Sequence, residues 1–70
     1  MSTPEFTNKQ LAACATRELS MRRRVYPRWV ADRRMSQKKA DEEIALMEAI
    51  EQHFHKAALE DDARANPKLL

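Results

Sequence analysis

The hydrophobic residues of this chain recur with the period of an α-helix. When each residue is turned by about 100° around a helix axis, half of the first segment collects the apolar side chains Leu11, Cys14, Ala15, Leu19, Met21, Val25, Tyr26, Trp29 and Val30. A second segment repeats the pattern with Ala40, Ile44, Met47, Ile50, Phe54, Ala57 and Ala58, and Leu46 widens it on one side. The pattern predicts an all-α protein made of two amphipathic helices.

Capping residues indicate where the two helices begin. Thr7 can cap the first helix, and Gln10 stands three residues later as its capping-box partner. A rival start is the stretch 3–5, Thr-Pro-Glu, because proline is favoured at the first helical position. Ser36 is the next good N-cap and indicates the start of the second helix.

These signals divide the chain into a hairpin and two ends. We expect a flexible N-terminal arm at 1–6 and an antiparallel two-helix hairpin at 7–63, with helix 7–33, a tight turn at 33–36 and helix 37–63. The tail 64–70 is expected to fray, because the acidic residues 60–62 oppose the helix dipole and Pro67 ends any helix. The chain has no glycine, so the turn lacks the residue that most easily adopts positive φ.

Pro27 lies inside the first predicted helix. It falls on the polar face, where water can bond the carbonyl of Arg23 that loses its backbone donor. We therefore expect a helix that is kinked near Pro27 and continues beyond it. The alternative is a break into two helices at Tyr26, because the residue before proline disfavours helical backbone angles.

The apolar faces are too wide for one hairpin to cover. A chain of 70 residues supports only a small core, and its single cysteine, Cys14, cannot form an internal disulfide. A symmetric homodimer that forms a four-helix bundle would cover the surplus apolar surface. The predicted dimer interface consists of Trp29, Met47, Ile50 and Phe54.

Two charged residues lie near the middle of the first apolar face. Glu18 and Arg22 are four residues apart in the order that favours an ion pair. One interpretation is that both side chains lie beside the contact between the two helices, which we call the seam, and extend to water. The other is a polar lock, Glu18 with Arg22, that fixes the register of an oligomer.

Charge is distributed unevenly along the chain. Residues 1–35 carry eight Lys/Arg against three Asp/Glu, a net charge of +5, whereas residues 36–70 carry five against eight, a net charge of −3. Antiparallel packing would lay a basic helix against an acidic one. The total of +2 is small for non-specific DNA binding, and the arginines between 22 and 34 do not share one helix face.

The segment 21–30 is the most distinctive stretch for binding. It contains the only Trp, the only Tyr, a Pro and four of the eight Arg. Arginine beside an aromatic anchor is typical of binding hot spots, so we predict that Arg24, Tyr26, Arg28 and Trp29 bind a partner. The alternative for Trp29 is a place in the core, because it shares the wheel direction of Leu11.

Residues that could carry chemistry are few. The sequence has no nucleophile-base pair, phosphate loop or metal set, so we expect a protein that is not an enzyme and binds no cofactor or metal. His53 and His55 are two residues apart and face different ways. Cys14 is expected to be a small buried hydrophobe. No run of 18 apolar residues exists to cross a membrane, which indicates a soluble cytoplasmic protein.

The chain resembles a family of small phage and prophage proteins. The resemblance covers residues 17–54 and rests on Arg-Arg-Arg-Val-Tyr-Pro-Arg-Trp-Val at 22–30, then Arg-Met-Ser at 34–36, Lys-Ala at 39–40, Glu-Ile at 43–44 and Met-Glu-Ala-Ile at 47–50. Family members often have a helix-ending glycine where this chain has Arg33. That departure puts the geometry of the turn in doubt.

In size, hairpin architecture and phage link, the chain is also similar to the quorum-sensing anti-activators that transposable phages make early in infection. This resemblance implies a homodimer in the host cytoplasm that takes part in host takeover. Its implied partners are a LuxR-type transcription activator and a type IV pilus assembly ATPase, which it would inhibit. It assigns no binding residues. The alternative from another class is a small nucleic-acid-binding regulator that uses the arginine-rich aromatic segment.

Overall fold

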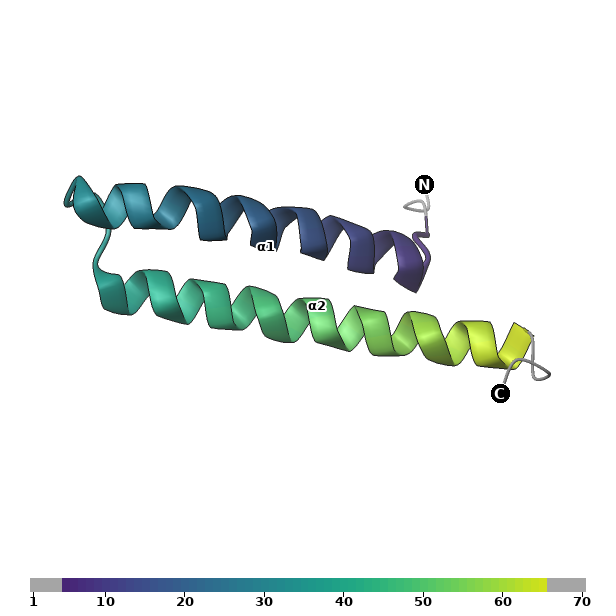
Figure 1. The fold of residues 1–70 in the computed structure, drawn as a ribbon. Helices are drawn as coiled ribbons and strands as arrows, with labels where there is room; N and C mark the ends of the chain where they lie inside the picture. Colours follow the sequence, from purple (N-terminus) through teal and green to yellow (C-terminus); the bar gives the residue numbers. More distant parts are fainter. Residues whose placement is uncertain (1–4, 66–70) are drawn as a thin grey trace.

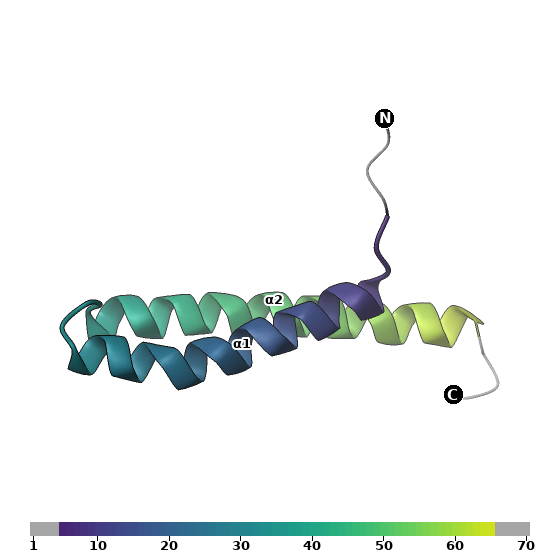
Figure 2. The ribbon, with the colours of Figure 1, turned by 90° about the horizontal axis from the view of Figure 1, so that it is seen from above.

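The protein is an antiparallel hairpin of two long helices. The computed structural model describes residues 5–65, which form α1 (Asn8–Ala31) and α2 (Gln37–Ala65). The two helices pack side by side, and α2 extends past the start of α1 (Figures 1 and 2). Every regular element of the described residues is helical, which confirms the prediction of an all-α hairpin.

The capping box fixes the start of α1. The Gln10 backbone N–H donates to Thr7 Oγ1 over 3.0 Å, and the Thr7 backbone N–H donates to Gln10 Oε1 over 2.9 Å. Two backbone donors that the first turn leaves without helical partners are thereby satisfied. The rival start at 3–5 is not used, because Glu5 is outside the helix; Thr3 and Pro4 lie outside the described residues.

The turn ends α1 in a Schellman motif built without glycine. The Arg33 N–H donates to the Val30 carbonyl over 3.1 Å, and the Arg34 N–H donates to the Trp29 carbonyl over 2.8 Å. Arg33 has a φ of 61°, the left-handed conformation that this motif requires and that disfavours a residue with a Cβ. The turn therefore carries local strain at Arg33, a position that glycine would occupy without a Cβ.

Ser36 starts α2, as its N-cap pattern predicts. The Lys39 backbone N–H donates to Ser36 Oγ over 3.1 Å, and the Ala40 N–H donates to the Ser36 carbonyl over 3.0 Å. The helix then continues to Ala65, two residues beyond the expected end at 63. Of the predicted arm and tail, residues 1–4 and 66–70 lie outside the described part of the chain.

Pro27 is incorporated in α1 without ending it. The helix continues for four residues beyond Pro27, to Ala31. Pro27 is exposed, so water can reach the carbonyl group that its missing N–H leaves without a partner. The break at Tyr26 does not occur, and a kink at Pro27 stays a prediction.

The core lies along the seam between the helices. Ala15 and Leu19 of α1 pack with Met47 of α2, and Ile44 covers this cluster. Ala12, Tyr26 and Ala40 are also buried. Three of these six buried side chains in the described residues are alanines, so small residues make up half of the buried seam.

The expectation that Cys14 is buried is wrong. Its side chain is exposed, whereas the adjacent Ala15 is buried. Consecutive helix residues differ by about 100° in direction, so the seam can take one of these two residues and not both. Leu19 lies four residues after Ala15 and fixes the choice, because the two share one face of α1.

Candidate interaction surfaces

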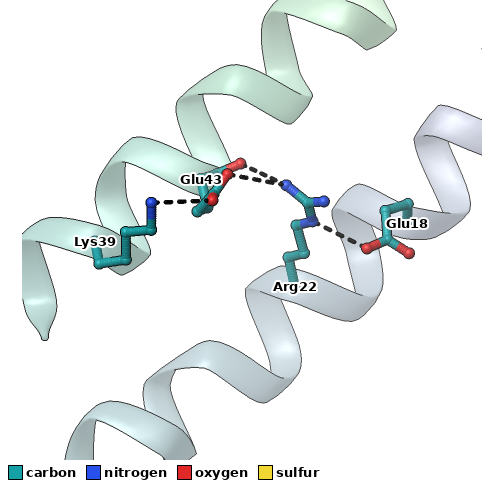
Figure 3. A network of polar contacts seen from close by, with 4 residues as sticks. All are labelled: Glu18, Arg22, Lys39 and Glu43. Carbon is teal, nitrogen blue, oxygen red and sulfur yellow. Dashed lines mark hydrogen bonds and ion pairs between the residues drawn. The ribbon is translucent and has the colours of Figure 1, made fainter. Parts of the chain in front are cut away.

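A polar network crosses the seam at Arg22 (Figure 3). Arg22 Nε donates to Glu18 Oε1 over 2.9 Å, and Arg22 Nη1 donates to the backbone carbonyl of Glu43 over 2.9 Å. Arg22 Nη1 also lies 3.8 Å from Glu43 Oε2, and Lys39 Nζ lies 3.4 Å from Glu43 Oε1. The Glu18–Arg22 pair therefore extends into a four-residue network that joins α1 to α2.

The arginine at the centre of this network stays charged. The hydrogen bond that Arg22 donates to Glu18 raises the pKa of Arg22 above its ordinary value, and the charges of Glu18 and Glu43 act in the same direction against desolvation. Its guanidinium carbon also lies 5.9 Å from the centre of the Tyr26 ring. A permanent half-buried cation with two carboxylate partners defines one rim of the seam.

Sequence reasoning missed two members of this network. The sequence alone assigns no partner to Glu43 or to Lys39. The sequence gives only a weak signal for the Lys39–Glu43 pair, because a spacing of four residues is common to many surface pairs on helices. Antiparallel packing brings Glu43 beside Arg22, and this is the contact that sequence spacing cannot give.

The opposite rim of the seam carries separate polar contacts. Thr16 Oγ1 donates to Glu51 Oε2 over 2.6 Å and lies 3.1 Å from His55 Nε2. Arg23 Nη2 lies 3.5 Å from Glu48 Oε1. The hairpin therefore has two distinguishable sides, one marked by Arg22 and the other by Thr16.

An uncovered apolar surface lies on the Arg22 side. Helix residues seven apart point in nearly the same direction, so Val25 shares the direction of Glu18, Trp29 that of Arg22, and Ile50 that of Glu43. Trp29 is 36% exposed, Ile50 43% and Leu46 58%. We call this surface the apolar flank; it consists of Val25, Trp29, Leu46 and Ile50.

The four predicted partner-binding residues do not form one patch. Arg24 and Arg28 are exposed on the side of α1 that points away from α2. Tyr26 is only 8% exposed and lies in the seam, because it is turned by about 200° from each of the two arginines. Its ring stacks on Trp29 with centroids 5.5 Å apart. Tyr26 thus supports the position of Trp29 and offers little surface to a partner.

The four predicted dimer-interface residues also divide. Met47 is buried within the hairpin against Leu19, so it has little surface left for a second copy. Trp29 and Ile50 lie on the apolar flank, whereas Phe54 follows Met47 by seven residues and points in nearly the same direction, toward the seam. The sequence predicts one apolar stripe on α2, but the structure divides it: Met47 packs against α1, whereas Ile50 remains exposed. Trp29 is partly exposed, so it is neither a fully buried core residue nor a fully exposed binding residue.

A metal-ligand group and a membrane-spanning helix are both absent from the described residues. Within residues 5–65, no three His, Cys, Asp or Glu side chains are grouped so that they could hold a metal ion. Thr16 with Glu51 and His55 is an exposed surface cluster, and its hydroxyl is occupied by the Glu51 carboxylate. Neither α1 nor α2 is long and apolar enough to cross a membrane.

At the open end of the hairpin, Asn8 bonds to Asp61. Asn8 Nδ2 donates to Asp61 Oδ2 over 2.9 Å, and Arg64 donates to the other carboxylate oxygen. These two hydrogen bonds, that of Asn8 first, lower the pKa of Asp61 below its ordinary value. The contact joins the first turn of α1 to the last turns of α2.

Comparisons with known proteins found no relative of this chain. No family model matches the chain, and neither does any curated protein or solved structure.

Proposed function

We propose that this protein is a non-enzymatic binding module that acts as a homodimer and inhibits the proteins it binds. The observation that carries the proposal is the apolar flank, where the hairpin leaves Trp29, Leu46 and Ile50 exposed on its Arg22 side. Exposed apolar surface on both helices at once is typical of a protein interface, whereas scattered single residues are not. Trp29, Leu46 and Ile50 contribute the largest exposed side chains of this flank.

The first occupant of the flank is a second copy of the chain. An isologous contact would place the flank of one copy on the flank of the other and form a four-helix bundle. Arg22 would then lie close to the dimer axis with its hydrogen bonds to Glu18 and Glu43 already made within its own chain. Because these groups are satisfied in advance, the polar lock fixes register without leaving an unpaired buried charge.

A kink at Pro27 fits this arrangement. Bending α1 toward the core would keep the segment from Pro27 to Ala31 against α2, so that Trp29 stays at the edge of the flank. The stack of Tyr26 on Trp29 holds the indole in the same place.

The inhibited protein is proposed from the resemblance to phage proteins. That resemblance implies a phage-encoded inhibitor in the host cytoplasm, with a LuxR-type quorum-sensing activator and a type IV pilus assembly ATPase as its targets. The apolar flank supports the proposal, because it offers exposed apolar side chains of both helices for protein contact. Nucleic-acid binding is the weaker alternative, because Tyr26 faces the seam and is not available to stack on a base beside Arg24 and Arg28.

The dimer is tested by the mass of the protein in solution. Sedimentation equilibrium should give twice the chain mass of 8.2 kDa for the wild type. The double variant Leu46→Glu, Ile50→Glu should sediment as a monomer, because each copy would place charge on the flank. Leu59→Glu is the matched control, since Leu59 is exposed outside the flank and its replacement should leave the mass unchanged. A monomeric wild type would remove the basis of the proposal.

Inhibition is tested with the two proposed targets. The purified protein should bind a purified LuxR-type activator or a pilus assembly ATPase and lower the activity of the one that it binds. Binding to neither would leave the binding-module proposal without these targets. Nuclease-treated and untreated samples should behave alike, and binding that disappears with nuclease would instead support the nucleic-acid regulator.

A further inference from the structure

The face of α1 opposite the seam carries three arginines in a row. Arg17 lies two residues before the buried Leu19, and Arg24 and Arg28 lie two residues before and after the buried Tyr26. Two positions turn a helix residue by about 200°, so all three point away from α2. Along the axis, Arg24 follows Arg17 by about 10 Å and Arg28 follows Arg24 by about 6 Å. We call these residues the arginine row.

The arginine row is not neutralised within the described structure. None of its three guanidinium groups forms an ion pair with a residue between 5 and 65, whereas Arg22 and Arg23 on the rims of the seam do. Glu18 is the only acidic residue in the sequence of α1, and it is bound to Arg22. From Arg17 to Arg28, the outer face of α1 therefore carries cations and no acidic side chain.

An apolar pocket adjoins the row at its N-terminal end. The pocket has a volume of about 420 Å³ and is lined by Phe6, Gln10, Leu11, Ala13, Cys14 and Arg17. Phe6 is largely exposed just before α1 begins. Arg17 belongs both to the pocket and to the row, so an apolar site and a line of cations form one continuous surface.

We propose that this outer face binds an acidic amphipathic helix of a partner protein. Apolar side chains of that helix would fill the pocket beside Phe6 and Leu11, and its carboxylates would pair with Arg17, Arg24 and Arg28. Guanidinium groups bind carboxylates with two parallel hydrogen bonds, and the spacings of the row match positions i, i+7 and i+11 of a parallel helix. The inference rests on the proposed function and names the chemistry of the inhibited partner.

A protein helix fits this surface better than a nucleic acid does. The sugar-phosphate backbone could pair with the arginines, but it has no apolar side chain to fill the pocket beside them. Three phosphate contacts would also give only a shallow salt dependence and weak affinity. The outer face is separate from both the seam and the apolar flank, so a dimer would display two copies of it, which suits a symmetric partner.

The experiment selects ligands without assuming a partner. A surface-displayed library of random peptides of about 20 residues, ~30 Å long as helices, is enriched for binding to the wild-type protein. We expect enriched peptides to carry a net negative charge and apolar residues at helical spacing. The enriched peptides are then measured against Arg24→Glu, Arg28→Glu, for which affinity should fall by about tenfold or more.

The matched control keeps the same charge change on the other helix. Lys38→Glu, Lys56→Glu alters two exposed cations of α2 and should leave peptide affinity within about twofold of the wild type. Sedimentation of both variants reports the dimer separately, so loss of peptide binding with an intact dimer concerns the arginine row alone. A selection without acidic bias, equal affinity for the two double variants, or tighter binding of a DNA duplex than of any enriched peptide would each overturn the proposal.

Discussion

Replacing Arg33 with glycine should stabilise the hairpin. Arg33 holds the left-handed C′ position of the Schellman motif with a φ of 61°. In that conformation the Cβ of an L-residue approaches the backbone at a cost of about 1 kcal/mol or more, and glycine has no Cβ. The backbone hydrogen bonds from Arg33 and Arg34 do not involve the side chain, so glycine keeps them.

The size of the effect follows from the backbone alone. Arg33→Gly should raise the free energy of unfolding by about 1 kcal/mol, which corresponds to a Tm increase of about 4–8 °C in a domain of this size. Urea and thermal unfolding, followed by circular dichroism at one fixed protein concentration, measure both quantities. The concentration must be held because dimerisation contributes to stability by mass action.

Two controls separate the backbone effect from the loss of charge. Arg33→Ala removes the same guanidinium but keeps a Cβ, so it should bring none of the gain. Arg34→Gly places glycine at the next position, which does not have positive φ, and should not stabilise. If Arg33→Gly is no more stable than Arg33→Ala, the strain that we assign to the turn is absent.

Three further predictions concern the cap, the seam and the open end of the hairpin. Thr7→Ala should lower the free energy of unfolding by about 1 kcal/mol, because it removes the capping box; an unchanged urea midpoint would contradict this. Leu19→Ala should lower it by about 2–5 kcal/mol, enough to unfold most of the protein at low concentration, since Leu19 is the largest fully buried side chain; a fully helical spectrum there would refute the assigned core. Asp61 should titrate below the ordinary pKa of an aspartate in NMR, and Asn8→Ala should raise that pKa. Because the pKa of Asp61 is lowered in the folded state, its stabilising contribution is fully present above the ordinary pKa and is lost as the pH falls through the folded pKa. An Asp61 that titrates at the ordinary pKa would contradict the Asn8 contact.

The starts of the helices were predictable because their signals are local. Thr7 with Gln10 and Ser36 act on backbone groups within one helical turn, so their residue types identify them in the sequence. The conformation of Arg33 was not predictable, because its residue type gives no sign of positive φ. The position of the turn came instead from the cap that follows it.

Hydrophobicity alone could not predict which apolar residues pack between the two helices. The apolar half of α1 is wide enough to hold two faces, and the sequence does not say which one packs within the chain. Alanine gives little signal, although Ala12, Ala15 and Ala40 are half of the buried residues in the described structure. For the same reason Tyr26 and Met47 were assigned to contacts with other molecules, whereas the hairpin uses them itself.

The pairing of apolar flanks between two copies is the central claim, and isotope-filtered NMR tests it most directly. A sample that mixes carbon-13-labelled and unlabelled chains shows nuclear Overhauser effects only between different molecules. The account predicts intermolecular contacts from the Ile50 methyl groups to other residues of the flank, and none from Leu59, which lies outside it. Intermolecular contacts at Leu59, or none at Ile50 in a sample that sediments as a dimer, would contradict it.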